Sequence, residues 1–481
     1  MIKFLLVLFL CNSTAATAQR GITWNSPMNI AAGSFGNQHP RITLDGAGNP
    51  LVIWGKMSDQ SVYFTRWTGA AFTTPVKLNP GWLTVATASW MGPDIASKGD
   101  TVYVVVRQSP ESVDTSKHIY IMKSFDGGIT FSAPVRVDYI GESISRFPTV
   151  TVDAAGNPIV AFMKFDLAFG DARWVVTTST DMGESFREDV KASGWGNSSA
   201  VCDCCPGAII SSGSTCAMLY RDNNSDIRDC WAGVSTSNGA TFTSGFELET
   251  NNWNFESCPA SGPDGVIVGD MLYSVFMNGA SGVYRTYLST ASIRSAETES
   301  VMNLAGSITG LNQQNYPRIA TDGNAMAVVW KQVVSGEQQL PILFTTDIAN
   351  GFPPTHEIVD LGDITNADVA LANGSVFVVW EDDNSGTVRF RSGTFATGTT
   401  GISGKTEKVF SVFPNPARDI LNISSAAIGN FHIRIFNSLG IVVYTGSATS
   451  DLRLDTSNFP SGLYMLQLQS AEGFFTQRFI R

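Results

Sequence analysis

The sequence is poor in basic residues, in histidine and in long apolar stretches, and each shortage narrows what the protein can do. The 31 Lys and Arg against 42 Asp and Glu leave a formal net charge of −11, which argues against a nucleic-acid partner because phosphate binding needs a basic face. Four scattered histidines, His39, His118, His356 and His432, make a histidine-supported catalytic zinc unexpected. Nor does any run approach the ~20 apolar residues of a membrane-spanning helix. We therefore expect no bound metal or cofactor and no membrane span.

The sequence also lacks the apolar periodicity of amphipathic helices. No stretch sustains an apolar repeat of about 3.6 residues, whereas short runs rich in Val, Ile and aromatic residues alternate with turns rich in Gly, Asn, Asp and Ser. Charged residues make up 15% of the chain and glycines number 45, a composition that suits short strands joined by tight turns. The sequence therefore predicts an all-β protein.

The first residues have the pattern of a secretory signal peptide. A short basic start precedes the apolar run Phe4–Leu10 and then Ala16-Thr17-Ala18, an Ala-x-Ala cleavage site. Cys11 raises the alternative of a lipoprotein, but Leu10 stands before it, where a small residue is expected. We expect a signal peptide over residues 1–18 and export of the mature chain.

The body of the chain repeats itself. A short start, with proline in most copies, and two apolar strand runs recur with a period of roughly 50–58 residues, the range of a four-stranded propeller blade. The repeat starts are Pro40-Arg41-Ile42, Gly92-Pro93-Asp94-Ile95, Phe147-Pro148-Thr149-Val150, Cys205-Pro206-Gly207, Ser261-Gly262-Pro263, Tyr316-Pro317-Arg318-Ile319 and Ala367-Asp368-Val369. Seven units predict a seven-bladed β-propeller, with six blades as the alternative if one weak unit is an insertion.

The last repeat is incomplete, because it stops at its third strand near Val388–Phe390. The segment Ile22–Met28 resembles the end of the other units. We expect it to supply the missing outer strand, which closes the ring and removes open sheet edges. The predicted propeller covers residues 19–398.

A sharper motif lies at the turn between the third and fourth strands of two units. It reads Ser124-x-Asp126-x-Gly128-x-Thr130-Phe131 and then Ser179-x-Asp181-x-Gly183-x-Ser185-Phe186, with a degenerate copy over residues 235–242. The aspartate can accept turn N–H groups, the glycine permits a positive φ, and the aromatic ring packs between sheets. The pattern resembles the Asp box of sialidase-like BNR-repeat propellers. The resemblance implies that the motif residues are structural and face away from the ligand site; they are Ser124, Asp126, Gly128, Thr130, Asp181 and Gly183.

The last 73 residues, 409–481, form a different module. Their alternating apolar strands and turns, from Phe413-Pro414-Asn415-Pro416 through Ile433–Asn437 to Gly462–Leu466, predict a small β-sandwich. The segment resembles the C-terminal sorting domain of the type IX secretion system. The resemblance implies contact with that secretion machinery, passage through the periplasm to the cell surface or the medium, and removal of the domain near a linker over residues 399–408.

Six cysteines remain after the signal peptide, all in one window of the predicted propeller: Cys202, Cys204, Cys205, Cys216, Cys230 and Cys258. An even number in an exported chain points to disulfides. We expect one of the first three to join Cys258, because both segments precede inner strands that converge on the channel. Cys216 and Cys230, on flanking strands, are the next expected pair. A soft-metal thiolate site for copper or zinc is the alternative.

Candidate ligand-binding residues gather around the same cysteines. Loops before the innermost strand and between the second and third strands open on one face of a propeller, where small-molecule sites gather. Arg221 and Arg228 are candidates for holding a carboxylate or sulfate, and Trp253 for stacking on a sugar. The structural alternative is that the two arginines pair with Asp222 and Asp229 to order the loop.

Three further arginines, at the starts of inner strands, could project toward the channel: Arg41, Arg146 and Arg318.

Two functions from different classes stay open. One is a surface or secreted propeller that binds a glycan or a protein ligand on its Cys/Arg/Trp-rich face, and we favour it. The other is a sialidase-like exo-glycosidase or other carbohydrate-active enzyme with Asp94, Asp222 or Asp229 as the acid. The Arg-Ile-Pro signature of sialidases is missing, since the order here is Pro40-Arg41-Ile42, and no Tyr–Glu pair is evident. No catalytic residue is therefore assigned.

We expect the secreted protein to begin at Gln19 and to lack Arg481, because both end segments are addressing signals that processing removes. Intact-mass spectrometry of protein from the medium and from the cell surface measures both ends. A mature form that retains Arg481 would contradict removal of the C-terminal domain.

Overall fold

The computed structural model describes residues 21–31, 35–109, 118–139, 143–196, 200–304, 308–396, 410–425, 431–437, 441–449, 451–470 and 473–481. The chain divides into two compact units, Met1–Thr397 and Gly398–Arg481. The predicted signal peptide and the predicted linker lie outside the described residues. Within those residues the one helical element is a 3-10 turn at Ile348–Asn350, and the rest of the regular structure is strand. The all-β prediction is confirmed.

Six sheets of the first unit share one plan, in which four consecutive strands pair antiparallel in chain order. The strands are β3 (Asn37–Leu44), β4 (Pro50–Lys56), β5 (Ser61–Arg66) and β6 (Val76–Lys77); β7 (Asp94–Lys98), β8 (Thr101–Arg107), β9 (Ile119–Ser124) and β10 (Val135–Arg136); β11 (Ile144–Val152), β12 (Pro158–Phe165), β13 (Arg173–Thr178) and β14 (Val190–Lys191); β15 (Ala208–Ser212), β16 (Thr215–Arg221), β17 (Cys230–Ser235) and β18 (Ser244–Glu247); β19 (Asp264–Val268), β20 (Met271–Asn278), β21 (Arg285–Ser292) and β22 (Glu297–Asn303); β23 (Leu311–Thr321), β24 (Met326–Val334), β25 (Glu337–Thr345) and β26 (Glu357–Leu361).

The seventh sheet joins the two ends of this unit. Its strands are β27 (Ile364–Ala372), β28 (Ser375–Asp382), β29 (Thr387–Thr394), β1 (Thr23–Trp24) and β2 (Met28–Asn29). Both N-terminal strands pair with β29, so that Thr23 lies opposite Thr394 and Met28 opposite Phe390. The predicted pairing of the N-terminal segment with the last repeat is confirmed.

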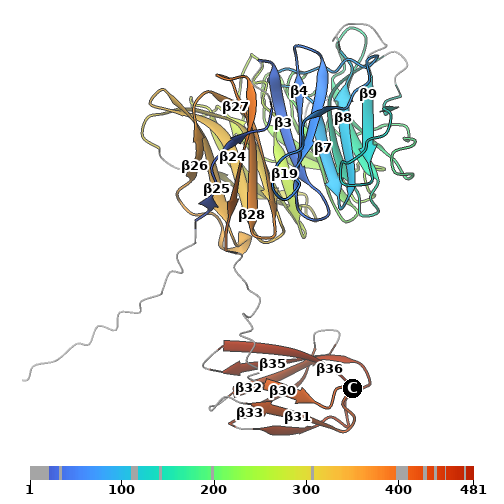
Figure 1. The fold of residues 1–481 in the computed structure, drawn as a ribbon, viewed down its shortest axis with the longest axis vertical. Helices are drawn as coiled ribbons and strands as arrows, with labels where there is room; N and C mark the ends of the chain where they lie inside the picture. The colour runs from blue at the N-terminus through green and yellow to red at the C-terminus, as the bar shows by residue number, and fades with distance from the viewer. Residues whose placement is uncertain are drawn as a thin grey trace, which may run out of the picture. The chain divides into compact units, whose positions relative to one another are not determined.

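The first strands of the seven sheets form a closed ring. Each contacts the first strand of the next sheet, in the order β3, β7, β11, β15, β19, β23 and β27, and β27 contacts β3. In Figure 1, β3 (blue) and β27 (orange) lie side by side although they come from opposite ends of the unit. Four-stranded sheets arranged around a ring of inner strands are the arrangement of a β-propeller.

Aspartates on three first strands tie neighbouring sheets together. Asp94 of β7 accepts hydrogen bonds from Thr149 Oγ1 at 2.8 Å and from Val150 N of β11 at 3.1 Å. Asp264 of β19 accepts one from Ile319 N of β23, and Asp368 of β27 accepts one from Ile42 N of β3, each at 3.0 Å. Each carboxylate thereby satisfies a backbone amide on the inner edge of the next sheet, which would otherwise lack a partner.

The turn after β9 has the hydrogen bonds that its sequence predicts. The Asp126 carboxylate accepts from Thr130 Oγ1 at 2.6 Å and from Thr130 N at 2.9 Å. Gly128 has φ 79°, and a Cβ there would lie 2.3 Å from Cζ of Phe64 in the preceding sheet. Asp181 and Gly183 repeat this arrangement after β13. These residues fix turns and pack sheets together.

The second unit consists of two antiparallel sheets, β30-β31-β34 and β33-β32-β35-β36. Their bounds are β30 (Phe410–Phe413), β31 (Ile420–Ser425), β32 (Phe431–Asn437), β33 (Val442–Ala448), β34 (Leu452–Asp455), β35 (Leu463–Ser470) and β36 (Gly473–Ile480). One apolar cluster includes residues of both sheets, among them Leu421 and Ile435. The unit therefore has a core of its own.

Removing residues 19–30 should lower the melting temperature of the first unit and broaden its transition, because β29 loses both β1 and β2 and its edge is exposed. Differential scanning calorimetry measures the effect. Truncation after residue 397 is the control, since it removes the other unit and leaves every strand pair of the ring in place. An unchanged transition in the 19–30 deletion would contradict closure by the N-terminal strands.

Candidate functional site

Bulges interrupt several first strands at the point where each enters the ring. The register shifts between Gln38 and Arg41 in β3, between Arg146 and Thr149 in β11, and between Asn315 and Arg318 in β23. In each bulge a residue directly before proline has a positive φ: His39 (55°), Phe147 (52°) and Tyr316 (52°). Such values are uncommon for non-glycine residues.

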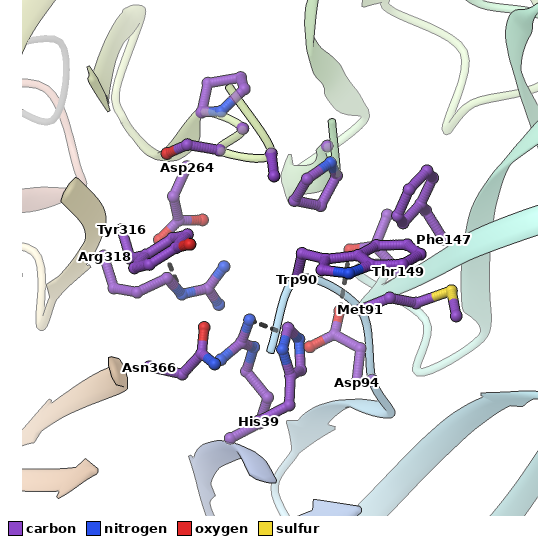
Figure 2. A pocket seen from close by; sticks show the side chains of 18 of the residues that line it. His39, Trp90, Met91, Asp94, Phe147, Thr149, Asp264, Tyr316, Arg318 and Asn366 are labelled. Atoms are coloured by element: carbon purple, nitrogen blue, oxygen red, sulfur yellow. Dashed lines mark hydrogen bonds and ion pairs between the residues drawn. The ribbon is translucent and has the colours of Figure 1, made fainter. Parts of the chain in front are cut away.

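A pocket lies where the starts of all seven first strands meet, and Figure 2 shows its side chains. All three bulge residues line it. Its other lining residues are Arg41, Trp90, Met91, Gly92, Asp94, Pro148, Thr149, Pro206, Gly207, Ala260, Ser261, Gly262, Pro263, Asp264, Pro317, Arg318, Asn366 and Ala367. The pocket therefore combines two arginines with two aspartates and several aromatic rings.

The two arginines of the pocket have different partners. Arg318 Nε lies 3.1 Å from Asp368 Oδ1 and 3.4 Å from Asp264 Oδ2. Arg41 has no ion pair among the described residues; its Nη1 donates to the Pro40 carbonyl, and its Nη2 lies 2.7 Å from His39 Nε2. Burial and the nearby Arg318 lower the pKa of Arg41 to about 10, so Arg41 stays charged at neutral pH.

His39 is the neutral partner of Arg41. Burial, and then the charge of Arg41, hold the pKa of His39 well below its usual range, so Nε2 accepts the hydrogen bond from the guanidinium. Its backbone N–H donates to Glu381 Oε2 at 3.1 Å, and Asn366 Nδ2 donates to the same oxygen at 3.0 Å. Burial raises the pKa of Glu381 to about 7. This network holds the His39 backbone, and Arg41 is left without a direct ion pair among the described residues, while Asp368, Asp94 and Asp264 act on its charge from further away.

Aromatic rings form the sides of the pocket. The half-buried Trp90 packs edge-on against Phe147, with ring centroids 5.6 Å apart. Figure 2 shows the rings of Trp90 and Tyr316 on either side of the Arg318 guanidinium. Burial raises the pKa of Tyr316, which is therefore a neutral phenol at physiological pH. The two rings offer apolar faces beside the positively charged guanidinium of Arg318.

Arg221 and Arg228, predicted as ligand-binding residues, are buried and bonded to the protein itself. Arg221 is 1% exposed and donates to the carbonyls of Ser261, Arg228 and Met277. Arg228 pairs with Asp226 at 3.2 Å. These contacts agree with the structural alternative, in which the arginines order the loop, but the partners differ from the predicted Asp222 and Asp229: Arg221 donates to backbone carbonyls, and Arg228 pairs with Asp226.

The other predicted residues of that loop are also buried outside the pocket lining. Asp229 accepts from the backbone N–H groups of Asn252 and Trp253, and burial raises the pKa of Asp222 to about 7. Trp253 stacks on Phe255, with Arg221 5.3 Å from its ring, so its faces are covered by the protein. Of the three aspartates considered as an acid, Asp94 lines the pocket.

The three arginines predicted to face the channel differ in whether they line the pocket. Arg41 and Arg318 line the pocket as predicted, whereas Arg146 is not among its lining residues. Arg146 Nη1 donates to the Asp203 carbonyl at 3.1 Å, and its guanidinium packs over the ring of Phe165. Arg146 therefore helps to hold the cysteine loop.

The predicted disulfide to Cys258 is present and comes from Cys204, with Cα atoms 6.2 Å apart. The predicted pair Cys216 and Cys230 is wrong: both are free thiols. They lie on adjacent strands but at opposite ends of the register, since Cys216 faces Ser235 and Cys230 faces Arg221.

The sulfur atoms of Cys202, Cys204 and Cys205 lie within 4.8 Å of one another. Because Cys204 is bonded to Cys258, two thiols of this cluster remain, fewer than the four ligands of a structural zinc site. The soft-metal alternative therefore requires the disulfide to be reduced first.

Sequence reasoning missed Trp90, Tyr316, His39 and Asn366. A usable signal existed for two of them, because His39 and Tyr316 directly precede the proline of a repeat start. Trp90 belongs to the irregular segment before β7 and carries no such mark.

Comparisons with known proteins identify the second unit. Residues 411–481 match the secretion system C-terminal sorting domain family, which indicates export followed by secretion or surface attachment. No curated protein matches the chain. No described helix is long and apolar enough to cross a membrane.

Solved structures similar to the chain include three that act on carbohydrates. An α-L-arabinofuranosidase of Fusarium graminearum is 11% identical with a TM-score of 0.45, over 67% of this chain and 98% of that one. An ulvan lyase is 11% identical with a TM-score of 0.49, over 79% and 96%. A sialidase of Trypanosoma rangeli is 12% identical with a TM-score of 0.42, over 92% and 84%.

Arg221→Ala should destabilise the first unit by on the order of 3 kcal/mol, because it leaves three buried carbonyls without their donor. Chemical denaturation measures the loss. Arg294→Ala is the control, since that side chain is 81% exposed and pairs with Asp270 at the surface; it should change stability by less than about 0.5 kcal/mol. Equal effects of the two substitutions would contradict a structural role for Arg221.

Proposed function

We propose that this protein is an exported seven-bladed β-propeller, followed by a small β-sandwich sorting domain, that binds an anionic extracellular ligand at the mouth of its channel. The ligand class is a saccharide that carries a carboxylate or sulfate group. The observation that supports the proposal is Arg41, a residue 9% exposed in the pocket lining, whose guanidinium has no ion pair among the described residues.

An unpaired buried charge is costly, and proteins normally pair it. Arg41 has no such direct partner: the charge of Arg318 lowers its pKa, and Asp368, Asp94 and Asp264 raise it from beyond ion-pair distance. An anion in the pocket would pair directly with Arg41 and accept from its remaining N–H groups. Guanidinium groups bind carboxylate and sulfate oxygens in paired hydrogen bonds, which favours a planar or tetrahedral oxyanion over a neutral group.

The aromatic walls favour a saccharide as the carrier of that anion. Trp90 and Tyr316 lie on either side of the Arg318 guanidinium (Figure 2). Aromatic faces pack against the apolar faces of sugar rings. The second unit, matched to the sorting-domain family, delivers the propeller outside the cell, where such saccharides occur. The binding face is thus proposed at the channel mouth and no longer at the Arg221–Trp253 loop.

The roles of the pocket carboxylates favour binding over hydrolysis. A glycosidase of the usual type needs two carboxyl groups about 5–10 Å apart that are available to the substrate. Asp94 accepts from Thr149 and Val150, and Asp264 accepts from Ile319 while contacting Arg318. Both aspartates thus hold neighbouring strands, which supports a rigid binding pocket.

Arg41→Met should weaken binding of carboxylated or sulfated oligosaccharides about 10- to 100-fold, the loss expected for a charge-assisted hydrogen bond. A glycan array carrying matched acidic and neutral oligosaccharides, followed by titration calorimetry of the best binder, measures it. Arg294→Ala serves as the control that removes a surface cation outside the pocket lining.

Inorganic sulfate should compete with the acidic ligand, and neutral oligosaccharides should bind no better to wild type than to Arg41→Met. Binding of neutral and acidic glycans with equal affinity, or an unchanged affinity in Arg41→Met, would contradict the proposal.

A further inference from the structure

Four sulfur atoms lie together where the segments leading into β15 and β19 meet. Cys204 is bonded to Cys258. The Sγ of Cys202 lies 3.5 Å from the Sγ of Cys204 and 3.1 Å from the Sγ of Cys205. Cys202 therefore stands between a disulfide and a second thiol, within contact distance of both.

The surroundings of Cys202 favour its thiolate. Arg228 Nη1 lies 3.2 Å from its sulfur. A hydrogen bond from the Cys205 thiol, and then the charges of Arg221 and Arg228, lower the pKa of Cys202 to about 6. Burial raises the pKa of Cys205 well above the usual value, so that Cys205 keeps its proton and donates it. The thiolate is the form that attacks disulfides.

The disulfide beside this thiolate joins a half-buried residue to an exposed one. Cys258 is exposed and Cys204 is half-buried, whereas Cys202 and Cys205 are buried. A thiolate that leaves from Cys258 would be released into water, which stabilises it, while the attacking group is shielded from outside reagents.

We propose that Cys202, Cys204, Cys205 and Cys258 form a thiol–disulfide exchange site, in which the crosslink moves from Cys204–Cys258 to Cys202–Cys205. In the first step the Cys202 thiolate attacks Cys204 Sγ; the bond to Cys258 breaks, and Cys258 leaves as a thiolate that takes a proton from water. In the second step the Cys205 thiol loses its proton and attacks Cys202 Sγ. The bond between Cys202 and Cys204 then breaks, and Cys204 leaves with the electron pair and accepts the proton.

The exchange balances without an outside oxidant or reductant. One disulfide and two thiols enter, and one disulfide and two thiols leave. The product has a different disulfide connectivity from the starting protein. The crosslink between the segments before β15 and β19 is replaced by one inside the loop that contains Cys202 and Cys205. Cys258 becomes a free surface thiol, two residues before the pocket-lining Ala260.

Alkylation of the folded wild-type protein with iodoacetamide tests the exchange. The reagent traps Cys258 each time that the exchange frees it, so label at Cys258 should accumulate together with a Cys202–Cys205 disulfide in non-reducing peptide maps. Cys230, which is fully buried, reports unfolding in the same sample and should stay unlabelled. The rate of Cys258 labelling should rise about tenfold between pH 5 and pH 7, since the fraction of Cys202 thiolate rises through its pKa of about 6.

Three variants separate the steps. Cys202→Ser should slow Cys258 labelling at least tenfold, Cys205→Ser should stop the exchange at a Cys202–Cys204 disulfide, and Cys216→Ser should match wild type. Wild-type label that appears at Cys258 and Cys230 together, or label at Cys258 that is independent of pH and of Cys202, would overturn the proposal. Labelling of the wild-type protein tests the exchange even if the Cys202→Ser protein fails to fold.

Discussion

The whole first unit depends on how seven inner strands are held to one another without hydrogen bonding as a sheet. Backbone amides on the inner edges need acceptors, and side-chain carboxylates supply them at three of the seven junctions, through Asp94, Asp264 and Asp368. Water could solvate these amides but would not fix the angle between sheets. The carboxylates satisfy the amides and also fix the angle between the sheets, which explains why acidic residues occupy the most crowded part of the ring.

The same requirement produces the pocket. Inner strands that converge on one axis bring their first residues together, so polar side chains at several strand starts, such as Arg41, Asp94 and Arg318, line the channel mouth. The carboxylates that hold the sheets also compensate Arg318. Arg41, two strands further around the ring, forms its hydrogen bonds with a neutral imidazole and a carbonyl, and the same carboxylates act on it only from beyond ion-pair distance. The difference between these two arginines turns a structural ring into a candidate anion site.

The sequence predicts the fold well because the relevant signals are local and repeated. Strand runs and repeat starts recur in each unit, the turn motif of Ser124–Phe131 returns in two others, and one incomplete repeat indicates the pairing of β1 with β29. The site is predicted less well because it depends on side-chain direction and burial. Arg221 and Trp253 look like a binding surface in sequence, yet they point inward, whereas Trp90 reaches the pocket from an irregular segment. Strand convergence predicted that Cys258 pairs with Cys202, Cys204 or Cys205 without choosing among them, and it did not predict the register that separates Cys216 from Cys230.

Closure of the ring by its two ends has a consequence for biogenesis. The contact between Asn25 and Ser392 joins residues 367 positions apart, so β1 and β2 emerge from the ribosome long before their partner strand exists. The ring cannot be completed until almost the entire first unit is made, and contacts of such long sequence separation form slowly. The seam between β29 and the N-terminal strands is therefore expected to be the last part of the ring to form.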